Sequence, residues 1–386
     1  MGQNKIKIAY LDYSHIFAGA ERVLYTIIAN IDRKKYEPIL ILPYPMDHHK
    51  QYASLSCKKK YLADRLEFWM GSERWNHPLR GTDFLARTIW GYKILRYLRR
   101  ENVNILHVNL IRPDSLMWIL PVKIKGVKVI GHFRSQALEW IPPKSVQKCC
   151  DLILCVSKYS QERMLIKGKY THSIVLYDSI DVNSFKTNLS RVEAKVKLGF
   201  PEDCYLISSV GQLSRHKGHD NAIKAFAKIA HQFPQVVLYI AGGGGEGDLM
   251  YLKQISDKYI DLRDRIVFSN TQITNITEVY RASDLILSLT KVGEAFGLVP
   301  YEATIMGTPF IAPDKGAIKE FIVNMENGIL VNTEDVNSIA SCVRWAIEHT
   351  SKIEEMNIKA YNLIMEKLTP KVMTMHLEGV YKSLFE

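Results

Sequence analysis

Short apolar runs alternate with longer amphipathic segments along the whole chain. Runs rich in Ile, Val and Leu predict strands that are buried on both faces of a sheet. The segments between them, such as residues 21–31, 88–101 and 220–232, have helical periodicity. This alternation is typical of α/β domains built on parallel sheets. The predicted strands are residues 6–11, 37–42, 104–108, 128–132, 152–156 and 173–176 in the first half, and 206–211, 236–241, 265–268, 285–289, 308–312 and 328–331 in the second.

The two series of strands indicate two domains in tandem. The chain has 386 residues, and a domain typically contains about 100–200 residues. The polar stretch 183–202 separates the two series and contains no predicted strand, so we expect the linker there. We therefore predict a first domain at residues 1–185, a second domain at residues 186–369, and an added helix at residues 370–386.

The composition excludes several classes of protein. A hydrophobic fraction of 47% with 24% charged residues is ordinary for a globular protein, which excludes a disordered or fibrous chain. No apolar run approaches the ~20 residues that span a bilayer, and the first residues lack the apolar stretch of a secretory signal. The six cysteines form no C-x-x-C pair, which favours free thiols over disulfides or a metal site. We expect a cytoplasmic protein.

The net charge of +11 is distributed unevenly. Residues 1–190 contain 30 Lys and Arg against 16 Asp and Glu, a net charge of +14, and the remainder contains 21 against 24, a net charge of −3. Basic stretches at residues 57–60 and 93–100 lie near Trp and Tyr side chains. Such stretches suit an anionic membrane surface or a polyanion such as nucleic acid, and they also occur on ordinary solvated helices. The asymmetry as a whole favours an anionic partner for the first half.

The clearest candidate site is the segment 294–302, EAFGLVPYE, which follows the predicted strand 285–289. Gly297 allows the backbone to approach a ligand closely, and Pro300 suits the first turn of a helix. A helix that begins near Leu298 would direct free N–H groups at an anion such as a phosphate. Glu294 and Glu302 bracket this turn and can accept hydrogen bonds from sugar hydroxyls. The alternative is a capping carboxylate together with a surface glutamate.

Other candidates follow other predicted strands, at the edge where α/β sheets bind ligands. After strand 206–211, Arg215 and Lys217 flank a glycine-containing turn and can neutralise a diphosphate. The alternative is a solvated basic turn. After strand 6–11, Gly19 can face a ligand while Glu21 lies early in the next helix. The alternative there is a tight turn and a capped helix.

The end of strand 128–132 carries a further pair of polar residues. His132 can donate a hydrogen bond to a hydroxyl, and Arg134 can meet an acidic group. The alternative is a structural histidine. The run 242–247, GGGGEG, satisfies the G-x-G-x-x-G pattern but follows the second strand of its domain and lacks the acidic partner. We interpret it as a glycine-lined loop and not as a dinucleotide site.

In this order, the segments resemble the retaining, nucleotide-sugar-dependent glycosyltransferases of the glycosyl transferases group 1 type (family four). The resemblance covers nearly the whole chain. It implies the GT-B fold, an α/β architecture of two Rossmann-like domains whose parallel sheets face a central cleft. It also implies retention of the anomeric configuration without a metal. The segments that carry it are residues 18–23 (AGAERV), 178–181 (DSID), 210–218, the E-x7-E motif at 294–302, and 307–309 (GTP).

The resemblance implies roles for individual residues. In the second domain, Glu302 would bind the ribose, Glu294 would touch the donor sugar, and Lys217 would neutralise the leaving diphosphate. In the first domain, Gly19 would let its turn approach the phosphate or acceptor, and His132 would lie near the donor sugar and the reaction centre. The other implied residues are Phe296, Gly297, Leu298 and Val299 for the diphosphate, Asn270 and Gln272 for the base, and Arg134 and Glu21 on the acceptor side.

The chain departs from the family pattern at Gln212, where the family has an arginine that binds phosphate. Arg215 lies three residues further along, and we hypothesise that it compensates. The resemblance also implies that the helix at residues 370–386 crosses back onto the first domain.

These expectations predict a hexosyltransferase that moves a sugar from a nucleotide-diphosphate sugar to a hydroxyl of a glycan or lipid-linked acceptor. The setting would be bacterial surface polysaccharide synthesis, such as capsule or lipopolysaccharide, at the inner face of the cell membrane. A UDP-sugar is the favoured donor and GDP-mannose the second, with no nucleic acid partner. The alternatives are a nucleotide-sugar epimerase or hydrolase on the same fold, or a non-catalytic binding subunit.

Overall fold

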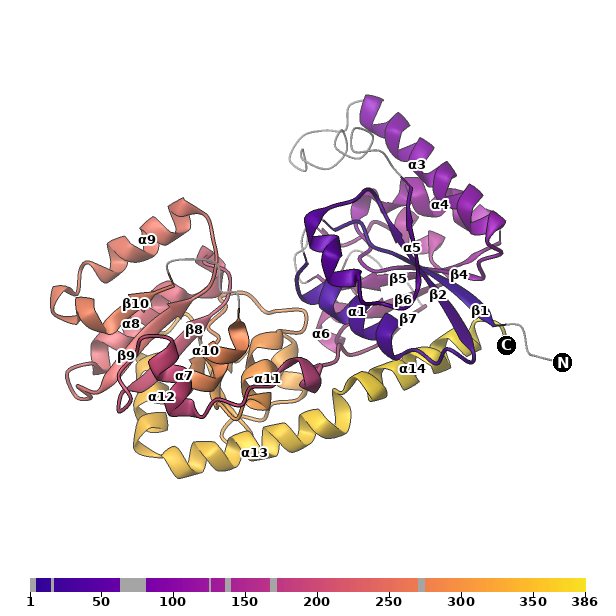
Figure 1. Ribbon diagram of the computed structural model, residues 1–386. Coiled ribbons are helices and arrows are strands. Elements are labelled where there is room, and N and C mark those ends of the chain that lie inside the picture. The colour runs from indigo at the N-terminus through magenta and orange to yellow at the C-terminus, as the bar shows by residue number, and fades with distance from the viewer. Residues whose placement is uncertain are drawn as a thin grey trace. The chain divides into compact units, whose positions relative to one another are not determined.

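The computed structural model describes residues 5–14, 17–62, 81–124, 126–135, 140–166, 172–269 and 275–386 (Figure 1). The chain divides into two compact units. The first contains Met1–Ser179 together with Pro370–Glu386, and the second contains Ile180–Thr369. Each unit holds one sheet whose paired strands all run parallel. The predicted α/β class with two Rossmann-like domains is confirmed.

The sheet of the first unit has the order β3-β2-β1-β4-β5-β6-β7. The chain moves outward from β1 to β3 and then returns to the other side of β1 at β4, so the strand order reverses between β1 and β4. Ligands of such sheets bind outside the carboxyl ends of strands at this switch point. The strands are β1 (Ile6–Leu11), β2 (Tyr36–Leu42), β3 (Lys58–Tyr61), β4 (Ile105–Val108), β5 (Lys128–Phe133), β6 (Leu152–Cys155) and β7 (Ser173–Val175).

Strand β3 is one that the hydrophobic pattern does not predict. Its sequence is Lys-Lys-Lys-Tyr, and it lies at the edge of the sheet with three of its four residues exposed. An edge strand needs no apolar faces, and lysines on it oppose pairing with another chain. The basic stretch at residues 57–60 is therefore partly a feature of the sheet edge.

Helices cover both faces of the first sheet. One face packs against α1 and α14, and its core includes Leu24, Ile27, Met373, Leu377 and Tyr381. The opposite face packs against α3, α4 and α5. The helices of this unit are α1 (Gly19–Asn30), α3 (Gly81–Arg100), α4 (Leu116–Ile124), α5 (Lys144–Cys149), α6 (Lys158–Leu165) and α14 (Pro370–Ser383).

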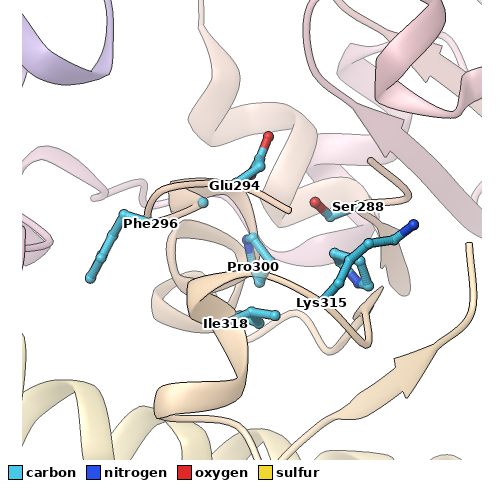
Figure 2. Close-up of a pocket in the computed structure, with 8 residues that line it drawn as sticks. Ser288, Glu294, Phe296, Pro300, Lys315 and Ile318 are labelled. Atoms are coloured by element: carbon cyan, nitrogen blue, oxygen red, sulfur yellow. The ribbon is translucent and has the colours of Figure 1, made fainter. Parts of the chain in front are cut away.

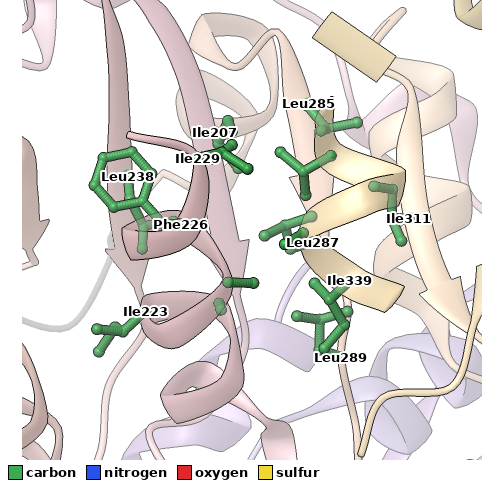
Figure 3. Packing of buried hydrophobic residues seen from close by; sticks show 14 of the residues in the cluster. Ile207, Ile223, Phe226, Ile229, Leu238, Leu285, Leu287, Leu289, Ile311 and Ile339 are labelled. Atoms are coloured by element: carbon green, nitrogen blue, oxygen red, sulfur yellow. The ribbon is translucent and has the colours of Figure 1, made fainter. Parts of the chain in front are cut away.

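The second unit repeats the plan with the strand order β10-β9-β8-β11-β12-β13, so its switch point lies between β8 and β11. Its core is formed by side chains such as Ile207, Phe226, Leu238 and Leu287 (Figure 3). The strands are β8 (Tyr205–Val210), β9 (Val236–Ala241), β10 (Ile266–Phe268), β11 (Leu285–Leu287), β12 (Phe310–Pro313) and β13 (Ile329–Val331). The helices are α7 (Arg191–Lys197), α8 (His219–Ile229), α9 (Glu246–Ser256), α10 (Ile276–Ala282), α11 (Leu298–Ile305), α12 (Val336–Glu348) and α13 (Thr350–Lys367).

The polar stretch 183–202, which we expected to be a linker, contains helix α7. Its start is a capping box, in which Ser190 Oγ accepts from the Glu193 amide and Glu193 Oε2 accepts from the Ser190 amide at 2.7 Å. Lys195 is buried and pairs with Asp284 at 2.7 Å. These contacts place the helix in the second unit, because a buried lysine requires a charged partner.

Candidate functional site

The main candidate site lies at the carboxyl edge of the second sheet. Strands β8 and β11 are hydrogen-bonded neighbours, so the loops that follow them open at the same edge. The loop after β8 carries Lys217, and the loop after β11 carries Glu294. Lys217 Nζ donates to Glu294 Oε1, and both side chains are partly exposed. The sheet topology thus brings together two of the residues that the sequence singled out, although they lie far apart along the chain.

A pocket opens beside this ion pair at the start of helix α11 (Figure 2). Gly297 has φ +81°, and a Cβ atom there would lie 2.7 Å from Glu294 Oε2, so only glycine fits without strain. The residue provides no side-chain cap, and α11 begins immediately after it at Leu298. The first turn of a helix attracts anions through its unpaired amides. The pocket is lined by Ser288, Glu294, Phe296, Gly297, Pro300, Pro313, Lys315 and Ile318.

Glu302 lies further along α11 and is buried within the second unit. Its Oε2 accepts a hydrogen bond of 2.8 Å from the hydroxyl of Tyr280 on α10. This contact fixes the direction of the carboxylate. Sequence reasoning missed Tyr280, because the sequence of α10 does not indicate that Tyr280 contacts Glu302.

The basic residues of this edge have different partners. The guanidinium of Arg215 lies over the ring of Tyr251, 4.6 Å from its centroid. Lys315 lines the pocket, and its Nζ donates to the Lys291 carbonyl at 2.9 Å. Lys315 was missed by sequence reasoning, although it follows strand β12 and the strand-end rule could have found it. Asn270 and Gln272 lie outside the described residues.

The glycine run at residues 242–247 has a packing explanation. A Cβ atom on Gly242 would lie 1.7 Å from the Gly211 carbonyl oxygen, so the loop after β9 packs directly on the backbone after β8. Close approach of two backbones requires glycine.

The first unit has its own polar cluster after β1. Gly19 begins helix α1, and Glu21 is buried, with Oε2 accepting from the Ala18 amide at 2.9 Å. Asp12 follows β1 and accepts from the Tyr52 hydroxyl at 2.6 Å. Burial and the nearby Glu21 raise the pKa of Asp12 to about 6. Sequence reasoning missed Asp12, although it too follows a predicted strand.

His132 and Arg134 lie at the end of β5, which extends to Phe133. The His132 side chain is fully buried, and burial and Arg134 hold its pKa well below the usual range, so the ring is neutral. Arg134 forms an ion pair with Asp178 and donates from Nε to the Asn109 carbonyl at 3.2 Å. The acidic group that Arg134 meets in this structure belongs to the chain itself.

Comparisons with known proteins connect this geometry to a family. Residues 190–363 match the family model described as glycosyl transferases group 1. An uncharacterized glycosyltransferase of Methanocaldococcus jannaschii is 27% identical over 219 residues, which cover 55% of this chain and 54% of the relative. A D-inositol 3-phosphate glycosyltransferase of Mycolicibacterium smegmatis is 31% identical over 176 residues, which cover 44% of this chain and 38% of the relative. The matches therefore span about half the length of these relatives, or less.

Solved structures share the architecture over the whole chain. Anabaena HepE in complex with UDP superimposes with a TM-score of 0.81 at 19% identity, covering 98% of this chain and 100% of that chain. Another structure of HepE is a complex with UDP-glucose. The two parallel-sheet units thus define a protein of the GT-B fold class. Within the second unit, residues 190–363 match the glycosyl transferases group 1 family, which the sequence motifs predicted.

Proposed function

We propose that the chain is a retaining glycosyltransferase that moves a sugar from a nucleotide-diphosphate sugar to an acceptor hydroxyl. The observation that carries the proposal is the Lys217–Glu294 ion pair beside the pocket at the start of α11. A lysine, helix amides and a carboxylate meet there, which suits a diphosphate attached to a sugar.

In this proposal the diphosphate binds at the amides of residues 296–299, and Lys217 turns from Glu294 to the diphosphate. Glu294 is then available to accept hydrogen bonds from the donor sugar, and Glu302 binds the ribose. The bond between the anomeric carbon and the diphosphate oxygen breaks as the acceptor oxygen bonds to that carbon on the same face. The acceptor proton passes to the leaving diphosphate, whose charge Lys217 offsets.

The proposed donor is a UDP-sugar, with GDP-mannose as the second candidate. HepE, which shares the fold, binds UDP and UDP-glucose. Thermal unfolding of the protein with UDP, GDP and ADP separates the candidates, because a ligand at 100 times its Kd stabilises by about 2.7 kcal/mol. A shift with GDP alone would contradict the UDP assignment.

Turnover tests the assignment directly. We expect Glu294→Gln to lower kcat by about 10²-fold, because a lost contact to developing charge has that effect, whereas Glu326→Gln, at an exposed site of the same unit, should retain the wild-type rate. Donor consumption in buffer without an acceptor would indicate an epimerase or hydrolase. Donor binding without consumption under any condition would indicate a binding subunit.

We further propose that the acceptor is a lipid-linked saccharide of a surface polysaccharide pathway. Helix α3 presents Tyr92, Arg96, Arg99 and Arg100 at helical spacing, and all four are exposed. A basic face with an aromatic residue suits an anionic membrane surface. No helix in the part of the chain that the structure describes has the length and hydropathy of a membrane span.

Flotation with liposomes tests the membrane proposal. Binding should require anionic lipid, should weaken as salt screens the charges, and should fall in the variant Arg96→Glu with Arg100→Glu. The matched control reverses two exposed lysines of the second unit, Lys253→Glu with Lys319→Glu. Binding that is equal with neutral and anionic lipid would contradict the proposal.

A further inference from the structure

Two ion pairs join the same two loops of the second unit. One loop follows β8 and leads into α8, and the other follows β11 and leads into α11. Lys217 of the first loop pairs with Glu294 of the second. Asp220, at the start of α8, pairs with Lys291 of the second loop, with 2.8 Å between Oδ2 and Nζ. Asp220 lies three residues after Lys217 and Lys291 three residues before Glu294, so the charges are reversed from one pair to the other.

The two ion pairs differ in how far they are shielded from water. The side chains of Lys217 and Glu294 are 27% and 19% exposed, whereas that of Asp220 is only 3% exposed. A buried carboxylate is costly unless a charged partner offsets it. Burial by itself would raise the pKa of Asp220, but the ammonium groups of Lys291 and Lys224 outweigh it, so this pKa lies below its ordinary value. Asp220 is therefore an anion at pH 7, and its separation from Lys291 would be costly.

The backbones of the two loops are also in contact beside the buried pair. The Lys291 amide donates to the His216 carbonyl at 2.7 Å. A Cβ atom on Gly218 would lie 2.0 Å from the Leu289 carbonyl oxygen, so the two backbones approach as closely as only glycine allows. His216 and Gly218 are the chain neighbours of Lys217. Contacts with the loop after β11 therefore set the position of the Lys217 backbone.

Donor binding would break one of these ion pairs. In the proposed function Lys217 turns from Glu294 to the diphosphate, which removes their link between the two loops. The amides that bind the same diphosphate belong to the second loop and the start of α11, so the two loops have to stay together at that moment. Asp220 and Lys291 are not among the residues that line the pocket, so their ion pair can persist while the donor is bound.

We propose that Asp220 and Lys291 are positioning residues, which hold the loop of Lys217 against the loop of Glu294 after the diphosphate has displaced the Lys217–Glu294 pair. The inference rests on the proposed function for the identity of the ligand. It assigns to Lys291 an effect on the reaction that passes through Lys217, because the Lys291 side chain bonds to Asp220 and its amide holds the carbonyl that precedes Lys217.

Turnover with a matched pair of lysine variants tests the proposal. Lys224 donates to the same Asp220 oxygen at 3.3 Å, but it lies on α8 itself and does not join the two loops. We expect Lys291→Met to lower kcat about tenfold or more, because misplaced groups lower kcat by up to ~10²-fold. Lys291→Arg, which retains the charge, should recover most of the rate, and Lys224→Met should keep the wild-type kcat. Equal kcat in Lys291→Met and Lys224→Met would overturn the proposal. If Lys291→Met does not fold, Asp220→Asn repeats the test from the other loop and should lower kcat likewise.

Calorimetric titration of the full-length protein provides a second measurement that needs no turnover. The probe is whichever of UDP, GDP and ADP stabilises the wild-type protein most. Lys291→Met should weaken its binding about fivefold, and by less than about twofold when Lys217→Ala is also present, because residues that act through one another are not additive. An equal loss in both backgrounds would indicate a general structural defect and would overturn the proposal.

The titration also separates this proposal from the proposed function. If the wild-type protein binds a nucleoside diphosphate but transfers no sugar, the proposed function fails while the titration still tests the Asp220–Lys291 ion pair. Binding of none of the three nucleotides would overturn both.

Discussion

The two units share one topology but use their polar residues in opposite ways. The first unit contains 31 Lys and Arg and 17 Asp and Glu, a net charge of +14, and the second contains 20 and 23, a net charge of −3. The acidic second unit nevertheless assembles the lysine, glutamate and helix start that suit a diphosphate. The basic first unit instead contains two buried, neutral histidines, His107 on β4 and His132 on β5. Net charge therefore describes the surface of a unit and does not locate its site.

The largest expected effect concerns the ion pair of the second unit. Lys217→Ala should lower kcat by about 10²–10³-fold, because it removes the positive charge that faces the leaving diphosphate. Lys253→Ala, at an exposed site on α9, serves as the control and should keep the wild-type rate. Steady-state kinetics with the donor identified by thermal shift make the measurement. Equal rates for the two variants would show that turnover does not depend on the positive charge of Lys217.

The second expected effect is a difference between the two units in how their stability depends on pH. His107 and His132 of the first unit have pKa values lowered by burial, as does His219 of the second unit, whose pKa falls to about 4. The unfolded chain binds protons on these residues below pH 6.5, whereas the folded chain does not. Stability is therefore complete above pH 6.5 and falls at lower pH, by up to ~1.4 kcal/mol per histidine for each pH unit. Asp12 opposes this trend, because its raised pKa favours the folded chain as the pH falls from about 6.

Thermal melting at pH 7, 6 and 5 measures this dependence. With two such histidines, the first unit should lose more stability than the second between pH 7 and pH 6, and below pH 6 Asp12 offsets one of these two histidines. His107→Gln should flatten the pH dependence, and His231→Gln, at an exposed site, should leave it unchanged. Melting that is independent of pH in the wild-type protein would contradict the buried neutral histidines.

A third effect tests whether the turn before α11 has room for a side chain at residue 297. Gly297→Ala introduces a Cβ atom 2.7 Å from Glu294 Oε2 at a positive φ. We expect a loss of about 1–2 kcal/mol in the free energy of unfolding, measured in urea. Gly247→Ala has open space for its Cβ atom and is the control. If both variants are equally stable, a side chain at residue 297 is accommodated without the strain that the close approach to Glu294 predicts.

The smallest expected effect concerns Arg215, which we propose as a substitute for the family arginine replaced by Gln212. Arg215→Ala should weaken donor binding about fivefold, equivalent to ~1 kcal/mol, because one exposed cation is lost while Lys217 remains. Calorimetric titration with the nucleotide measures it, with Arg263→Ala as the exposed control. Unchanged affinity would leave Lys217 and the helix start as sufficient for the diphosphate.

Much of the fold was predictable because the strands are buried on both faces. Strands such as β9 and β12 are continuous apolar runs, so each could be identified from local sequence. Strand β3 could not, because an edge strand of three lysines and a tyrosine has no buried face to mark it. Helix α7 had a local signal in its Ser-x-x-Glu capping box, which was overlooked in a polar stretch.

The sequence by itself determined which residues follow strands, and therefore which side chains can gather at a sheet edge. Lys217, Glu294 and His132 were identified in this way, because parallel strands end at one edge whatever their order. Only the tertiary structure decided the pairing of these residues. Lys217 meets Glu294 because β8 lies next to β11, and Tyr280 meets Glu302 because α10 packs near α11. Tyr381 reaches His107 across 274 residues of chain, a contact that no local pattern encodes because it depends on where the last helix packs.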